Sequence, residues 1–271
     1  MKERPLILIT NDDGVRSPGL RAAAAACEDL GEVLIVAPTY QQSGAGRSMP
    51  STSEGRIFAE PVSINGHTLT GYGIEGTPAQ AVQHGLFEIA QPPVSLVVSG
   101  INYGENLGEG ITVSGTVGAA MEAASFGVPA IAISLQTAAE HYLSHSETVD
   151  FAVAAHFLHR FVAAILDRGL PPQTDLLKIE VPQHATLETP CRWTRMSRQR
   201  YFHPVILPRR RPADPSPLGY EVRVQLDQVE PGSDIQAVII DKVVSITPIT
   251  LDMTAPVEVN RLEEWLDQSA V

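Results

Sequence analysis

The sequence predicts an α/β protein in which helices cover both faces of a mostly parallel sheet, giving three layers. Several short runs consist of apolar residues without polar alternation, which is typical of strands buried on both faces. Helix-like segments alternate with these runs, as right-handed βαβ crossovers require. The chain has 271 residues, of which 44% are hydrophobic, and this is enough for a large core.

The elements of the first two-thirds of the chain follow from these patterns in order. The first strand ends in two acids, and Ser17 followed by Pro18 marks the start of a helix. Thr77 and Pro78 mark another helix start in the same way. The predicted strands are 5–10, 33–37, 94–98, 129–134 and 176–181, and the predicted helices are 18–30, 78–90, 116–126 and 147–166.

Two segments depart from this alternation. Residues 56–70 alternate around Asn65-Gly66, which is a strong signal for a β-hairpin turn. After about residue 185, prolines cluster, and 219–225 and 237–247 resemble strands with no helix between them. We expect an extended C-terminal β-hairpin arm that contacts another subunit, the alternative being a surface excursion that packs on its own core.

We therefore expect three parts along the chain. Residues 1–185 form the α/β catalytic core, and residues 186–255 form the β-rich arm for oligomerisation. Residues 256–271 form a terminal segment whose amphipathic part, 256–266, is predicted to be a short helix carrying Trp265.

Charge and cysteine content exclude several classes of protein. The formal net charge is −12, and such a surface repels nucleic-acid backbones, although it still allows a small phosphorylated ligand. Two cysteines do not make a disulfide framework. The first apolar run is too short for a signal peptide and no stretch is long enough to span a membrane, so we expect a cytoplasmic protein without membrane contact.

The most informative segment is the end of the first strand, where Asp12 and Asp13 stand side by side. Loops at the carboxyl ends of parallel strands form the ligand crevice of such folds. Two adjacent carboxylates repel each other, and a divalent cation is the simplest way to keep both ionised. The alternative is a plain turn or helix cap, but Ser17 already provides the start signal of the next helix.

Two more loops follow buried strands and can meet the acid pair at the same sheet edge. Residues 38–46 include Ser43, and residues 99–108 include Asn102. Hydroxyl, amide and carboxylate oxygens suit Mg²⁺, Mn²⁺ or Ca²⁺, and the absence of Cys and His from these loops disfavours zinc and copper. Taken alone, either residue would more simply be a turn or cap residue.

A glycine-rich stretch then leads into Ser114-Gly115-Thr116 at the start of a helix. Its glycines let the backbone approach a ligand, and the free N–H groups of a helix N-terminus bind anions. A plain Ser or Thr cap is the alternative. Neither the dinucleotide-binding pattern after the first strand nor the P-loop pattern occurs.

These motifs occur together in one order: Asn-Asp-Asp-Gly at 11–14, Ser-Gly at 43–44, Ser-Gly-Ile-Asn at 99–102, Asn-Leu-Gly at 106–108, Ser-Gly-Thr-Val at 114–117 and Ser-Ile-Thr-Pro at 245–248. In this the chain resembles the SurE (survival protein E) family of metal-dependent 5′-nucleotidases and acid phosphatases. The resemblance implies a Rossmann-like core and an arm around residues 219–247 that is exchanged between subunits, giving dimers or tetramers.

The resemblance also implies a set of site residues and one divalent cation per subunit, Mg²⁺ or Mn²⁺, with Ca²⁺ able to replace it in crystals. The implied ligands are Asp12, Asp13, Ser43 and Asn102, and the implied phosphate contacts are Ser114, Gly115 and Thr116, with Asn106 close by. Thr39 and the pair Gln80-Ala81 depart from the residues that the family commonly has at these positions.

The predicted function is hydrolysis of nucleoside 5′-monophosphates. The cation polarises the phosphoryl oxygens, and the amides at 114–116 stabilise the charge that develops. Asp12, next to Asp13, is the expected general base or nucleophile.

Three alternatives remain at this point. A haloacid-dehalogenase-type phosphatase needs a second acid where Gly14 stands, and a receiver-like module needs an acceptor Asp in the 99–102 turn. A nucleotide sensor without turnover would keep the same residues.

Overall fold

The structure is a computed structural model that describes residues 4–142, 145–258 and 261–262. Most of the predicted C-terminal helix over 256–266, including Trp265, lies outside the described residues.

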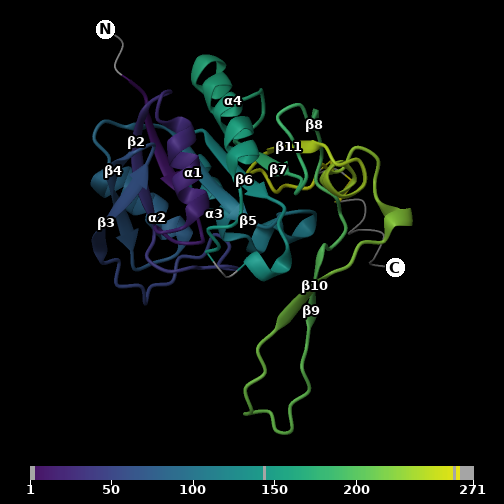
Figure 1. Ribbon diagram of the computed structural model, residues 1–271. Helices are drawn as coiled ribbons and strands as arrows, with labels where there is room; N and C mark the ends of the chain where they lie inside the picture. The colour runs from purple at the N-terminus through teal and green to yellow at the C-terminus, as the bar shows by residue number, and fades with distance from the viewer. Residues whose placement is uncertain (1–3, 143–144, 259–260, 263–271) are drawn as a thin grey trace.

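The core is a nine-stranded sheet with the order β3-β4-β2-β1-β5-β6-β7-β11-β8 (Figure 1). The six strands from β4 to β7 are parallel, whereas β3 and β11 run antiparallel to their inner neighbours. The bounds are β1 (Leu6–Thr10), β2 (Glu32–Pro38), β3 (Ile57–Ile64), β4 (His67–Ile74), β5 (Val94–Tyr103), β6 (Ala130–Leu135), β7 (Leu176–Val181), β8 (Cys191–Trp193) and β11 (Val244–Ile249).

Helices cover both faces of this sheet, so the predicted three-layer α/β fold is confirmed. Strand β1 shows why, because Ile7 and Ile9 pack into one apolar cluster and Leu8 into the other, all fully buried. The first cluster contains α1 (Pro18–Cys27) and α4 (Ala152–Arg168), and the second contains α2 (Pro78–His84) and α3 (Gly115–Ser125).

Helices α1, α2 and α3 begin within one residue of their predicted starts. Thr77 and Gln80 form a complete capping box at α2, so Gln80 is a good residue at that position. Ser17 precedes α1 as predicted, but its hydroxyl makes no capping bond and is buried without a partner. Helix α1 ends at Cys27 rather than residue 30, and α4 begins at Ala152 rather than 147. Short helical turns are η1 (Gly85–Ile89), η2 (Glu109–Val113), η3 (Ala139–His141), η4 (Leu226–Gln228) and η5 (Gln236–Ile240).

The predicted hairpin around Asn65-Gly66 is present as β3 and β4. Both turn residues have positive φ, 43° and 86°, as a two-residue hairpin turn of the primed type requires.

The C-terminal third contributes both to the main sheet and to a separate hairpin. Strands β8 and β11 extend the main sheet. Strands β9 (Phe202–Val205) and β10 (Gly219–Val222) pair antiparallel, and the hairpin they form extends away from the body of the molecule (Figure 1). Within the described ranges, no helix combines the length and the apolar character that crossing a membrane requires.

The predicted strand over 237–247 was wrong in its first half. Residues 236–240 form the π-helical turn η5, and the strand there is β11, which begins at Val244. The apolar run Ile235–Ile240 packs partly against Leu107 and Tyr201, and a short apolar run has the same composition in a buried turn as in a buried strand.

Candidate metal and phosphate site

The three predicted loops meet where the strand order reverses. Strand β1 lies between β2 and β5, and all three run parallel, so their carboxyl ends lie at one edge of the sheet. The chain moves from β1 outward to β2 and later returns to β5 on the other side, which makes this edge a topological switch point. Asp12 and Asp13 follow β1, Ser43 follows β2, and Asn102 lies near the end of β5.

Asp12 is buried and held at the N-terminus of α3. Its Oδ1 accepts a hydrogen bond from Thr116 Oγ1 at 2.5 Å, and the main-chain N–H groups of Gly115 and Thr116 also bond to the carboxylate. Burial raises the pKa of Asp12, and these hydrogen bonds oppose that shift. A Cβ at Gly115 would lie 2.6 Å from the Asp12 Cβ, so only glycine allows this approach.

Asp13 is 1% exposed, and one of its oxygens lacks a partner. Oδ1 accepts from Gln41 Nε2 at 3.0 Å, and the main-chain N–H of Tyr103 also bonds to the carboxylate. Oδ2 is buried and unpartnered. Burial, followed by the neighbouring charge of Asp12, raises the pKa of Asp13 well above its usual range. A buried carboxylate in this state lacks a positive partner.

The Gln41 side chain links Asp13 to Ser43. Its Nε2 lies 3.0 Å from Asp13 Oδ1, 3.1 Å from Ser43 Oγ and 2.7 Å from the Tyr142 carbonyl oxygen. One amide nitrogen with two hydrogens therefore faces three oxygens. Oxygen atoms from the loops after β1 and β2 and from the distant residue Tyr142 therefore come together at this point.

Asn102 reaches the same place from β5. Its Nδ2 donates to the carbonyls of Tyr103 and Gly104, at 3.2 and 2.7 Å. The amide nitrogen is thus engaged in the loop, and Oδ1 is the atom that remains for a cation. Because the N–H of Tyr103 bonds to Asp13, Asn102 is placed beside the acid pair.

This donor set fits a hard divalent cation. Two carboxylates, a hydroxyl and an amide oxygen are the ligand types that Mg²⁺ and Mn²⁺ take, and the unpartnered Asp13 Oδ2 is an oxygen that a cation would satisfy. Among the described residues, His, Cys, Asp and Glu do not gather in threes that could hold a metal, so a zinc-type cluster is not an alternative there.

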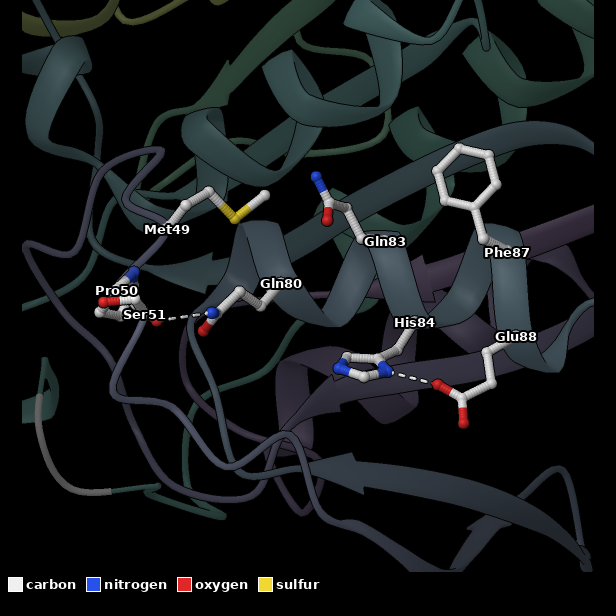
Figure 2. A pocket seen from close by; sticks show the side chains of 8 residues that line it. All are labelled: Met49, Pro50, Ser51, Gln80, Gln83, His84, Phe87 and Glu88. Atoms are coloured by element: carbon white, nitrogen blue, oxygen red, sulfur yellow. Dashed lines mark hydrogen bonds and ion pairs between the residues drawn. The ribbon is translucent and has the colours of Figure 1, made fainter.

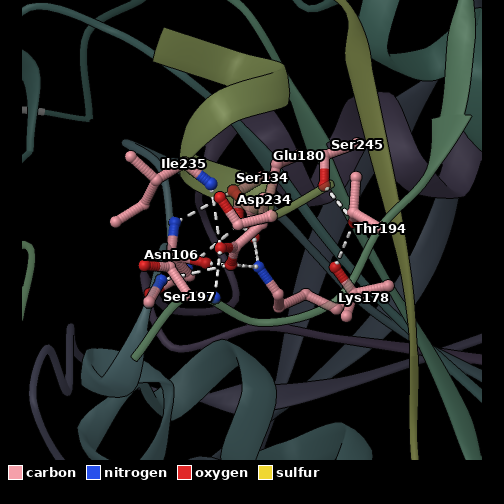
Figure 3. Close-up of polar contacts among 12 residues, drawn as sticks. Asn106, Ser134, Lys178, Glu180, Thr194, Ser197, Asp234, Ile235 and Ser245 are labelled. Carbon is pink, nitrogen blue, oxygen red and sulfur yellow. Dashed lines mark hydrogen bonds and ion pairs between the residues drawn. The ribbon is translucent and has the colours of Figure 1, made fainter. Parts of the chain in front are cut away.

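The predicted phosphate residues divide into two groups. Ser114 caps α3, with Oγ accepting from the Val117 N–H at 3.1 Å, and it adjoins the Gly115 and Thr116 amides that hold Asp12. Asn106 instead contacts a buried polar network (Figure 3). Its Nδ2 donates to Ser134 Oγ at 3.0 Å, and its main-chain N–H donates to Glu180 Oε2 at 2.9 Å.

Sequence reasoning missed three residues around the acid pair. Gln41 and Tyr142 contribute the contacts just described, and His145 places its Nε2 2.6 Å from the main-chain oxygen of Asp13. The side chain of His145 is half-buried. Because His145 is 132 positions away from Asp13, no local pattern could reveal the contact.

The fold and the site together define a class. The protein is a Rossmann-like α/β protein with a cluster of oxygen donors at a topological switch point, next to a helix N-terminus suited to anions. Residues 7–203 match the family model described as survival protein SurE. The chain belongs to the SurE family.

Known proteins are similar to this one over nearly the whole chain, in sequence and in structure. The proteins named 5′-nucleotidase SurE from Thermococcus gammatolerans and Methanocella arvoryzae are 45% and 42% identical, each over 96% of this chain and over 95% and 98% of their own lengths. The crystal structure of the SurE protein from Aquifex aeolicus has a TM-score of 0.75 at 32% identity, covering 97% of this chain and 100% of that one.

Proposed function

We propose that this protein is a divalent-metal-dependent phosphomonoesterase that hydrolyses nucleoside 5′-monophosphates to nucleoside and phosphate. The relatives named 5′-nucleotidase support the reaction. The observation that carries the proposal is the acid pair, in which Asp12 lies at the α3 N-terminus and Asp13 keeps a buried oxygen without a hydrogen-bond partner.

Four side chains would hold one Mg²⁺ or Mn²⁺ ion per subunit: Asp12, Asp13, Ser43 and Asn102. When bound, the ion supplies Lewis-acid polarisation of phosphoryl oxygens and activation of water. Binding of a cation by these four side chains would explain why two buried carboxylates with raised pKa values lie at the end of one strand.

The α3 N-terminus would hold the oxygens that stay on phosphorus. Ser114 offers a hydroxyl, and the main-chain N–H groups of Gly115 and Thr116, which bond to the Asp12 carboxylate in the structure, would be shared with the phosphate at the positive end of the helix dipole. Asp12 is held at the same terminus, so its carboxylate lies beside the phosphoryl group. There it acts either as general base, taking a proton from the attacking water, or as nucleophile.

Asn106 would stand at the edge of the phosphate site. Its main chain is fixed on both sides, with the N–H bonded to Glu180 and the carbonyl accepting from Lys178 Nζ at 2.7 Å. This anchoring holds the glycine-rich loop against the sheet.

We also propose a three-part organisation: core 1–185, a part 186–255 that carries the arm and adds strands β8 and β11 to the core sheet, and terminal segment 256–271. We assign the β9–β10 hairpin to self-association as dimer or tetramer, because it carries the exposed apolar residues Ile206, Leu207, Leu218, Tyr220 and Val222. Deleting residues 206–218 and measuring molar mass by light scattering tests this assignment, and an unchanged mass would contradict it.

We further place the protein in the cytoplasm, which suits its two free thiols, Cys27 and Cys191. Cell fractionation tests this location, and recovery in the secreted or periplasmic fraction would contradict it.

The function is tested with a panel of phosphate esters assayed with Mg²⁺, with Mn²⁺ and with EDTA. We expect AMP and GMP to be hydrolysed only with a divalent cation, and Asp13→Ala to abolish turnover while leaving the circular dichroism spectrum unchanged. Turnover in EDTA would contradict the proposal. Tight nucleotide binding without turnover would favour a nucleotide sensor.

The residues present disfavour the phosphatase of the haloacid-dehalogenase type and the receiver-like module. Gly14 has a φ of 104°, a conformation that strains any residue with a side chain, so the second acid of a haloacid-dehalogenase-type site does not suit this position. The end of β5 offers Asn102 rather than the acceptor Asp of a receiver-like module.

A further inference from the structure

Two surface cavities of about 480 Å³ lie near the loops between β2 and α2. The first cavity is formed by residues 49–51 and by α2 with η1 (Figure 2). The second cavity is lined by Tyr40, Gln42, Pro50, Thr52, Ser53, Glu54, Arg56, Ile74, Glu75, Gly76 and Thr77. We call them the helix cavity and the Tyr40 cavity.

The Tyr40 cavity adjoins the acid pair. Gln42, one of its lining residues, donates its main-chain N–H to the Asp12 carbonyl oxygen at 2.7 Å. Strands β2 and β4 are parallel neighbours, with Pro38 opposite Ile74, and Ile74 at the carboxyl end of β4 lines this cavity. The cavity is therefore on the same sheet edge as the site, on the side of β1 away from β5.

The helix cavity lies along α2, and its polar groups are largely engaged with one another. Gln80 completes the α2 capping box and donates to the Pro50 carbonyl, and Gln83 donates to Glu122. His84 and Glu88 bond to each other at 2.6 Å (Figure 2). This leaves few groups to recognise a ligand.

Tyr40 is the distinctive residue of the second cavity. Its side chain is 73% exposed, and it stands three positions before Ser43 on the loop that reaches the acid pair. An exposed aromatic face stacks on any nucleobase, since each base has a π face. The Thr52 hydroxyl and the Glu54–Arg56 ion pair add polar groups on the same wall, where the Ser53 hydroxyl donates to the Glu75 carbonyl oxygen.

We propose that the Tyr40 cavity is the subsite for the nucleoside half of the substrate, with the base stacked on the Tyr40 ring. This rests on the proposed function, because a phosphate at the α3 N-terminus sets one end of the substrate and the adjoining cavity receives the other. Tyr40 is then a specificity-determining residue that distinguishes nucleotides from simpler phosphate esters.

The test compares AMP with ribose 5-phosphate, a phosphate ester that lacks the base. We expect Tyr40→Ala to lower kcat/KM for AMP by about five- to a hundredfold, chiefly through KM, because stacking on one aromatic residue accounts for roughly that factor. Activity on ribose 5-phosphate should not change, because that ester has no base. Tyr40→Phe should retain AMP activity, since the ring is kept.

Phe87→Ala is the matched control, because Phe87 is a similarly exposed aromatic residue in the helix cavity, and we expect it to leave both substrates unaffected. An equal loss on AMP and ribose 5-phosphate in Tyr40→Ala, or loss of AMP activity in Phe87→Ala, would overturn the subsite. So would a changed molar mass of Tyr40→Ala in light scattering, which would make Tyr40 a subunit contact.

A binding measurement separates failure of the subsite from failure of the proposed function. If the wild-type protein hydrolyses neither ester, the proposed function fails. Calorimetric titration with adenosine still tests the cavity: weaker binding to Tyr40→Ala than to wild type supports it, and equal binding or none overturns it.

Discussion

Replacing Lys178 by Met should strongly lower the stability of the folded protein. Lys178 is fully buried, and its Nζ lies 2.9 Å from Asp234 Oδ2, 3.6 Å from Glu180 Oε1 and 2.7 Å from the Asn106 carbonyl (Figure 3). Asp234 is equally buried and also accepts from the N–H groups of Gly108, Ser197 and Ile235. The variant leaves that carboxylate charged without its cation.

Removing one partner of a buried ion pair costs roughly 3–5 kcal/mol, because the other charge stays desolvated. The entropy of unfolding near the midpoint is about 2.1 cal/mol/K per residue, or roughly 0.57 kcal/mol/K for 271 residues. The expected fall in Tm is therefore about 5–9 °C.

Scanning calorimetry and urea unfolding measure this loss, with Lys242→Met as the matched control because Lys242 is exposed. The control should stay within about 0.5 kcal/mol of wild type. The double variant Lys178→Met/Asp234→Asn should lose less than the sum of the two single variants, because it removes the unpaired charge. A loss below about 1 kcal/mol in Lys178→Met would refute the reasoning.

Three further predictions concern single side chains. Burial raises the pKa of Glu180 to about 8, so the folded state keeps a proton that the unfolded state releases near pH 4.5. Its contribution to stability is present at low pH and is lost as the pH rises through about 8. Urea unfolding at pH 5, 7 and 9 should therefore show a smaller fall in the free energy of unfolding for Glu180→Gln than for the wild type. An equal fall in the two proteins would contradict this prediction. Asp13→Asn should abolish the rise in Tm that Mn²⁺ gives the wild type, while the metal-free variant stays as stable as the wild type. If Mn²⁺ still raises the Tm of the variant, Asp13 is not a metal ligand. Ser114→Ala removes the cap of α3 and should cost about 1 kcal/mol, and it should also lower kcat/KM for AMP, whereas unchanged activity would deny Ser114 a role beyond capping.

Local patterns were enough to predict the layers and the end of β1, whereas β5 runs on to Tyr103 instead of ending at residue 98. Strand β1 has an apolar run that is buried on both faces, and its carboxyl end placed Asp12 and Asp13 correctly at the sheet edge. The convergence of Ser43 and Asn102 followed from the rule that parallel strands share this edge.

What could not be predicted depends on contacts between distant segments. Lys178 interrupts the apolar strand β7, and nothing in its neighbourhood indicates that Asp234, 56 positions later, will pair with it. The same applies to His145 at the main chain of Asp13. Residues 237–240 were predicted as part of a strand because a short apolar run has the same composition in a strand as in the turn that these residues form near Leu107.

The location of a bound Mn²⁺ ion tests the central claim most directly. In a crystal grown with Mn²⁺, we predict one anomalous peak per subunit, about 2.0–2.6 Å from Asp13 Oδ2 and within reach of Asp12, Ser43 and Asn102. An enzyme that is active with Mn²⁺ but shows its anomalous peak elsewhere, or shows none, would contradict this account.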